Sequence, residues 1–95
     1  GGGLTENIPR ILPAGLAAKI DLSSWELPPV FAWMQRAGHL EMSDMLKTFN
    51  CGMGAVLVVD AAHADAATAS LTASGEVVTR IGTLVASDDG AVQYR

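Results

Sequence analysis

The segment MGAVLVVD, residues 53–60, is the clearest strand signal in the chain. Its last apolar residues are four consecutive branched aliphatic side chains, and valine in particular favours extended backbone. A run that is apolar on both faces is typical of a central strand covered on each side of a sheet. The segment therefore predicts an α/β fold with residues 53–60 in the middle of the sheet.

Weaker patterns on both sides of this segment complete the expected order of elements. Apolar spacing and Gly/Pro punctuation predict helices over residues 4–12, 29–37, 40–49 and 60–74. Strands are expected over residues 16–22, 76–87 (bent at Gly82) and 91–94. The sum is one domain over residues 1–95, an α/β (α+β) fold with a mixed four-stranded sheet flanked by helices in a three-layer α/β/α-like arrangement.

Composition and charge narrow the function classes. A hydrophobic fraction of 49% and a charged fraction of 17% are typical of a globular domain. Six basic against ten acidic residues give a net charge of −4, and without a basic stripe we expect no nucleic-acid partner. No apolar run approaches the roughly 18 residues of a membrane span, so we expect no membrane partner. With Cys51 as the single cysteine and no signal peptide, we expect a reducing, cytoplasmic location.

The glycine motif GGGLTENIPR, residues 1–10, is the first candidate for ligand binding. Glycines directly before a helix expose backbone N–H groups to an anion, and Arg10 follows two turns later. Glu6 and Asn7 have two interpretations, ligand contact or capping of the helix. The three glycines have two as well, an anion-binding loop or a flexible chain end.

The motif TFNCGMG, residues 48–54, is the second candidate. Asn50, Cys51 and Gly52 either form a substrate-contacting turn or simply end a helix beneath it. A nucleophilic cysteine needs a positioned base, and neither His39 nor His63 has a known triad spacing to Cys51. No cluster has metal-ligand spacing, so we expect no catalytic residue and no metal ligand in this chain.

Three stretches taken together resemble a known family. GGGLTENIPR, DLSSWELPPVFAWMQRAG and EMSDMLKTFNCGMG, in this order and spacing, resemble the C-terminal portion of the phosphoribosylformylglycinamidine cyclo-ligases, also called aminoimidazole ribonucleotide synthetases. The resemblance spans essentially the whole chain. It implies that the chain begins inside the family's glycine loop, and that it is the C-terminal part of the C-terminal domain of a longer enzyme.

The resemblance implies an ATP-dependent ring closure in purine biosynthesis. Family members phosphorylate the formyl oxygen of formylglycinamidine ribonucleotide, and an amidine nitrogen then closes the imidazole ring with loss of phosphate. ATP and magnesium are bound mainly by an N-terminal domain that is absent here, and the whole enzyme is a homodimer. The resemblance therefore predicts that this chain alone is inactive.

Carried over by motif, the resemblance also implies the site residues. The substrate-binding set is Gly1, Gly2, Gly3, Glu6, Asn7 and Arg10, with Asn50, Cys51 and Gly52 as support for the loop. Gly2, Gly3 and Asn7 are expected to contact the phosphate or amide region of the substrate. Arg10 either assists this contact or fixes the loop.

Two other interpretations stay open at this point. One is a related ATP-dependent enzyme such as formylglycinamidine ribonucleotide synthetase, selenophosphate synthetase or thiamine-monophosphate kinase, which share a glycine-rich loop. The other is a non-catalytic α/β module that assembles through its sheet. The motifs ENIPR and TFNCGMG favour the cyclo-ligases over the related ATP-dependent enzymes.

Overall fold

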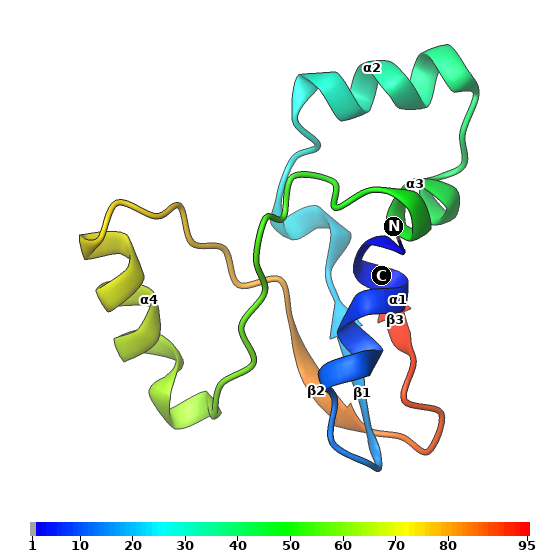
Figure 1. The fold of residues 1–95 in the computed structure, drawn as a ribbon. Helices are drawn as coiled ribbons and strands as arrows, with labels where there is room; N and C mark the ends of the chain where they lie inside the picture. The colour runs from blue at the N-terminus through cyan, green and yellow to red at the C-terminus, as the bar shows by residue number, and fades with distance from the viewer. Residues whose placement is uncertain (1) are drawn as a thin grey trace.

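Strand β1, Leu16–Ile20, is the centre of the sheet in the computed structural model, which describes residues 2–95 (Figure 1). It pairs antiparallel with β2, Gly82–Ala86, and parallel with β3, Val92–Tyr94. The sheet is thus mixed and three-stranded, in the order β2-β1-β3. A mixed α/β fold is confirmed, whereas the expectation of four strands is wrong for the described residues.

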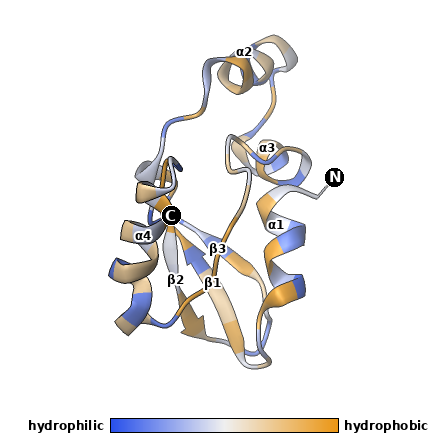
Figure 2. Ribbon diagram, turned by 60° about the vertical axis from the view of Figure 1, so that its left-hand side comes forward, coloured by the Kyte–Doolittle hydropathy of each residue, from blue (hydrophilic) through white to orange (hydrophobic). Residues whose placement is uncertain are grey.

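The expected central strand, residues 53–60, does not form in the structure. The segment belongs to no strand of the sheet, and Leu57, Val58 and Val59 are 64%, 43% and 44% exposed. Figure 2 colours much of this coil between α3 and α4 as hydrophobic. The pattern reflects side chains that favour extended backbone, but strand formation also needs a hydrogen-bonding neighbour, and side-chain periodicity does not specify one.

The expected strand over residues 76–87 is shorter than predicted, because β2 begins only at Gly82. Gly82 lies opposite Ile20, and a Cβ added there would collide with the carbonyl oxygen of Lys19. Glycine at this position therefore permits the close approach of β2 to β1. The residues before it continue away from the sheet.

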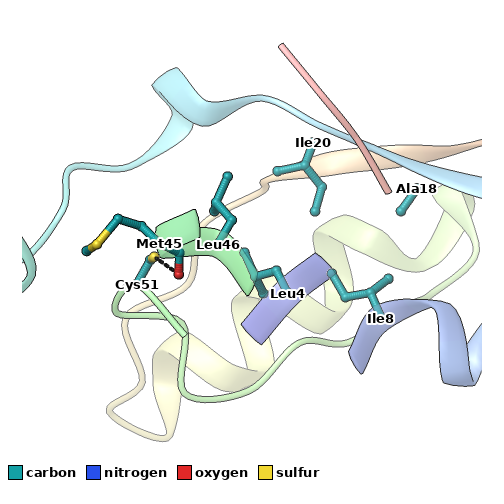
Figure 3. Close-up of a cluster of buried hydrophobic side chains, with 7 residues drawn as sticks. All are labelled: Leu4, Ile8, Ala18, Ile20, Met45, Leu46 and Cys51. Carbon is teal, nitrogen blue, oxygen red and sulfur yellow. Dashed lines mark hydrogen bonds between the residues drawn. The ribbon is translucent and has the colours of Figure 1, made fainter. Parts of the chain in front are cut away.

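Helices α1, Gly3–Asn7, and α3, Met42–Thr48, pack against each other beside the sheet. A 3-10 turn, η1 (Ile8–Ile11), continues α1 with Pro9 near its start, so the expected helix over residues 4–12 is divided in two. Their apolar side chains and those of β1 form the core (Figure 3). Its buried members are Leu4, Ile8, Ala18, Ile20, Met45, Leu46 and Cys51.

Helix α2, Pro29–Gly38, stands at the outer end of the molecule (Figure 1). The predicted start is confirmed, since Pro29 opens the helix, but the helix runs one residue further than predicted: Gly38 is its last residue and His39 ends it in the left-handed conformation at φ 52°. A short 3-10 turn, η2 (Leu22–Ser24), precedes it. Phe31 of α2 reaches the core through Phe49, with ring centroids 5.9 Å apart.

Helix α4, Ala64–Ala73, lies apart from the sheet at the end of an arm, residues 53–81 (Figure 1). The 3-10 turn η3, Ala61–His63, leads into it, which confirms the alanine-rich helix. The chain's radius of gyration is 14.0 Å. A compact chain of this length has about 12 Å, so the arm makes the molecule open.

Among the described helices, none is both long and apolar enough to cross a bilayer.

Candidate functional site

A cavity of about 460 Å³ lies between α1–η1 and the chain that follows α3. The two motifs singled out in the sequence meet here, because Gly3 and Asn7 line one wall and Asn50 lines another. The other lining residues are Leu4, Ile8, Ile11, Thr48, Met53, Gly54, Ala55 and Val56. We take this cavity as the candidate site.

The start of α1 needs its glycines for packing. Gly2 and Gly3 have φ values of 95° and 54°, in the left-handed region that favours glycine. A Cβ on Gly3 would collide with the backbone carbonyl oxygens of Leu46 and Phe49. Gly3 therefore lets α1 approach α3 closely, which is a structural role alongside the ligand contact predicted for it.

Asn7 links the first turn of α1 to Arg10. Its side-chain amide N–H donates to the carbonyl oxygen of Gly3 at 2.9 Å, and its amide oxygen accepts from Arg10 Nη1 at 3.2 Å. Asn7, with Gly3, lines the cavity. Arg10 is exposed and contacts Asn7, which is the geometry expected if it fixes the loop.

Two further predicted residues of the glycine motif, Gly2 and Glu6, are not among those that line the cavity. The carbonyl oxygen of Gly2 accepts a hydrogen bond from the N–H of Glu6 at 3.1 Å, and Gly2 itself is buried. The Glu6 side chain is exposed. Gly1 lies outside the described residues.

Asn50, Cys51 and Gly52 form a tight turn, called the NCG turn below. The side-chain oxygen of Asn50 accepts from the Gly52 N–H at 2.9 Å, and its carbonyl oxygen accepts from the Met53 N–H at 3.0 Å. Cys51 and Gly52 are both left-handed, at φ 53° and 96°. A Cβ on Gly52 would lie 2.7 Å from Cγ of Pro28, so only glycine fits against that ring.

Cys51 points from the turn into the core and is fully buried (Figure 3). Its thiol lies 3.5 Å from the carbonyl oxygen of Met45 and 3.8 Å from that of Phe49, and donates toward them. Burial raises the pKa of the Cys51 thiol. The thiol is therefore protonated at neutral pH and is a poor nucleophile, and the structure shows it packed in the core.

The sequence profile of the family described as "AIR synthase related protein, C-terminal domain" matches residues 1–95. This chain belongs to that family. The resemblance inferred from the three stretches is thus confirmed at the level of the family.

Relatives of this AIR synthase C-terminal domain carry the name phosphoribosylformylglycinamidine cyclo-ligase. The protein of Aromatoleum aromaticum is 52% identical over 93 residues, that of Bordetella petrii 50% and that of Burkholderia ambifaria 53%. Each match covers 98% of this chain but only 27%, 27% and 26% of the relative. The chain therefore spans about a quarter of the length of the curated relatives it matches.

Sequence reasoning missed one contact at the site of this family member. The indole Nε1–H of Trp25 donates to the carbonyl oxygen of Cys51 at 3.0 Å. A partly buried indole N–H needs an acceptor, and this requirement was the available signal. Identifying the acceptor required the fold, because the two residues are 26 positions apart.

The residues that line the cavity determine which kinds of ligand it can bind. The described lining residues are uncharged, and their polar side chains are the amides of Asn7 and Asn50 and the hydroxyl of Thr48. Such groups bind and orient a polar ligand through hydrogen bonds, and Arg10 adds a positive charge one hydrogen bond away. In the part of the chain that the structure describes, no group of three His, Cys, Asp or Glu residues is placed to hold a metal ion.

Proposed function

We propose that this chain is the C-terminal part of a phosphoribosylformylglycinamidine cyclo-ligase. The proposed enzyme converts formylglycinamidine ribonucleotide to aminoimidazole ribonucleotide, with ATP hydrolysed to ADP and phosphate, in purine biosynthesis. One observation carries the proposal: residues of the two motifs on which the resemblance to that family rests line one cavity. Identities of 50–53% over nearly the whole chain support it.

Within this proposal the chain supplies binding and orientation. Gly1, Gly2, Gly3, Glu6, Asn7 and Arg10 form the substrate-binding set. The amides of Asn7 and Asn50 face one cavity and can hydrogen-bond to phosphate or amide groups. Helix α1 has only five residues, so side-chain amides contribute more than a helix dipole would. Arg10 holds Asn7 in place and adds positive charge near the substrate phosphate.

ATP and magnesium belong elsewhere in the longer protein. The described residues do not fit a magnesium site, because they offer no cluster of carboxylates. We therefore assign ATP and magnesium mainly to an N-terminal domain, and derive no step through them here. In this view the whole chain is one domain segment of a cytoplasmic homodimer.

The same proposal includes a three-layer α/β/α arrangement in the longer protein. Helix α4 turns Ala64, Ala67, Thr68 and Leu71, spaced as one helical face, toward a cleft of about 1230 Å³ beside the sheet. A face of this kind favours packing on another layer. In the longer protein α4 would supply that further helical layer.

The test compares the full-length protein with this 95-residue chain. Full-length protein should release ADP only when formylglycinamidine ribonucleotide is present, with matching formation of aminoimidazole ribonucleotide. Selenide and thiamine monophosphate serve as control substrates for the related ATP-dependent enzymes. ATP consumption with either control, as ADP for thiamine monophosphate or AMP for selenide, and none with the ribonucleotide would refute the cyclo-ligase assignment. The isolated chain should show no turnover.

A second candidate, a non-catalytic assembly module, is favoured by the exposed apolar residues of the arm. Val77 is 97% exposed and Leu57 64% exposed, which is unusual for side chains of this size. Sedimentation of the chain alone at several concentrations tests it. Stable self-association, together with a full-length protein that lacks turnover, would favour this candidate.

A further inference from the structure

Within the NCG turn, Cys51 is held in a backbone conformation that a residue with a Cβ does not favour. Cys51 has a φ of 53° and is one of two described residues other than glycine with a positive φ. L-residues with a Cβ avoid this region, and such a conformation persists only when the surroundings impose it. Strained positions of this kind gather at functional sites, and Asn50, next to Cys51, lines the candidate cavity.

Contacts within the turn account for part of this constraint. The Gly52 N–H donates to the Asn50 side chain, and the Cys51 thiol lies against the carbonyl oxygens of Met45 and Phe49. These bonds hold the side chains of Asn50 and Cys51. They leave the carbonyl group of Cys51, whose position changes with the strained φ angle, to be held from elsewhere.

The segment before α2 supplies the missing constraint. Trp25 Nε1 donates to the Cys51 carbonyl oxygen at 3.0 Å, and the Pro28 ring packs against Gly52 so closely that a Cβ would lie 2.7 Å from Cγ. Trp25 itself is half-buried against the core. Asn50 lines the cavity, whereas Trp25 is not among its lining residues.

We infer that Trp25 is a positioning residue for the candidate site. Its indole N–H fixes the Cys51 carbonyl, and through it the left-handed turn that presents Asn50 to the cavity. The inference rests on the proposed function, since the substrate bound there is taken to be formylglycinamidine ribonucleotide. Trp25 acts through the turn and need not touch the substrate.

The test replaces the indole donor in the full-length protein while keeping the aromatic volume. Trp25→Phe removes the N–H, and incorporation of benzothienylalanine at position 25 replaces the N–H by sulfur in a ring of the same shape. The KM for formylglycinamidine ribonucleotide should rise about 3- to 10-fold in both, the effect of losing one neutral hydrogen bond. The kcat and the KM for ATP should stay within about twofold of wild type, because the bond acts on the substrate cavity alone.

A second readout follows the turn directly. The alkylation rate of Cys51, measured on its peptide by mass spectrometry, should increase in both Trp25 variants because the turn opens more often. Trp33→Phe is the matched control: Trp33 is on α2 and is 61% exposed, so both its KM and its alkylation rate should equal those of wild type.

Each outcome separates the inference from the proposed function. Unchanged KM in the benzothienylalanine variant overturns the inference, whether or not Cys51 becomes more reactive. A fall in kcat together with equal rises in the KM values for both substrates also overturns it, because such changes indicate general damage. A wild-type protein without turnover refutes the proposed function. Faster Cys51 alkylation in the variants would then show that the Trp25 hydrogen bond holds the turn without serving that reaction.

Discussion

Gly3 combines two constraints at one residue. Its φ of 54° lies in the left-handed region, and backbone carbonyl groups of α3 occupy the space where a Cβ would stand. Backbone atoms cannot swing aside as the end of a flexible side chain can. The glycine motif would therefore require glycine at this position even without a ligand.

Gly3→Ala should lower the free energy of unfolding by about 2–4 kcal/mol, the combined effect of left-handed strain and overpacking. Urea denaturation of the chain measures it. Gly15→Ala is the control, since Gly15 has a φ of 82° with no atom within 4 Å of the added Cβ. The control should lose only about 1–2 kcal/mol from strain. Equal losses in both variants would contradict the packing role of Gly3.

At the scale of elements, one hydrogen bond joins the two ends of the chain. The hydroxyl groups of Thr5 in α1 and Tyr94 in β3 lie 2.8 Å apart. Burial raises the pKa of Tyr94, an effect partly opposed by this hydrogen bond, and burial also raises the pKa of Cys51. Both groups are therefore more strongly protonated in the folded chain than in the unfolded one.

These shifts predict loss of stability in alkali. A raised pKa means that the folded state binds more protons than the unfolded state above the unfolded pKa, so the free energy of unfolding falls as pH rises. The decline should begin near the unfolded cysteine pKa of about 8.5 and continue past that of tyrosine, about 10. Thermal unfolding from pH 7 to 11 measures it.

Variants assign the two parts of the alkaline decline. Cys51→Ala should remove the part that begins first, and Tyr94→Phe the part that begins later. A Tyr94→Phe chain whose stability still falls as steeply as wild type above pH 10 would show that Tyr94 is not responsible.

At the scale of the whole molecule, the arm differs from the rest. Its segments on either side of α4, residues 53–60 and 75–81, lie in no strand of the described sheet, and they carry apolar side chains into solvent. In contrast, β1 has a paired strand on each side and buries Ala17, Ala18 and Ile20. Local stability should therefore differ sharply between the two.

Hydrogen exchange should resolve this difference in the isolated chain. Amides of residues 55–59 should exchange within seconds at neutral pH, because backbone without a ladder partner has little protection, while those of β1 should exchange most slowly. Mass spectrometry of peptides from the two regions measures both. Protection of residues 55–59 equal to that of β1 would indicate that the arm closes on a strand edge, within one copy or between two.

The sequence by itself determined the elements that depend on local chemistry. Proline at the start of α2 and the alanine-rich composition of α4 act within a few residues, so these helices were predictable. The sequence motifs likewise sufficed to identify the family. The two stretches that later met at the cavity were already recognisable as candidates.

Only the tertiary structure decided which residues become neighbours across the chain. Residues 53–60 carry the stronger strand pattern, but the central strand is Leu16–Ile20. The reason is that pairing depends on a distant partner and not on side-chain alternation. The close approach at Gly3, the convergence of Asn7 and Asn50, and the bond from Trp25 to Cys51 have the same origin. Each joins residues far apart in sequence, and no local propensity encodes such a contact.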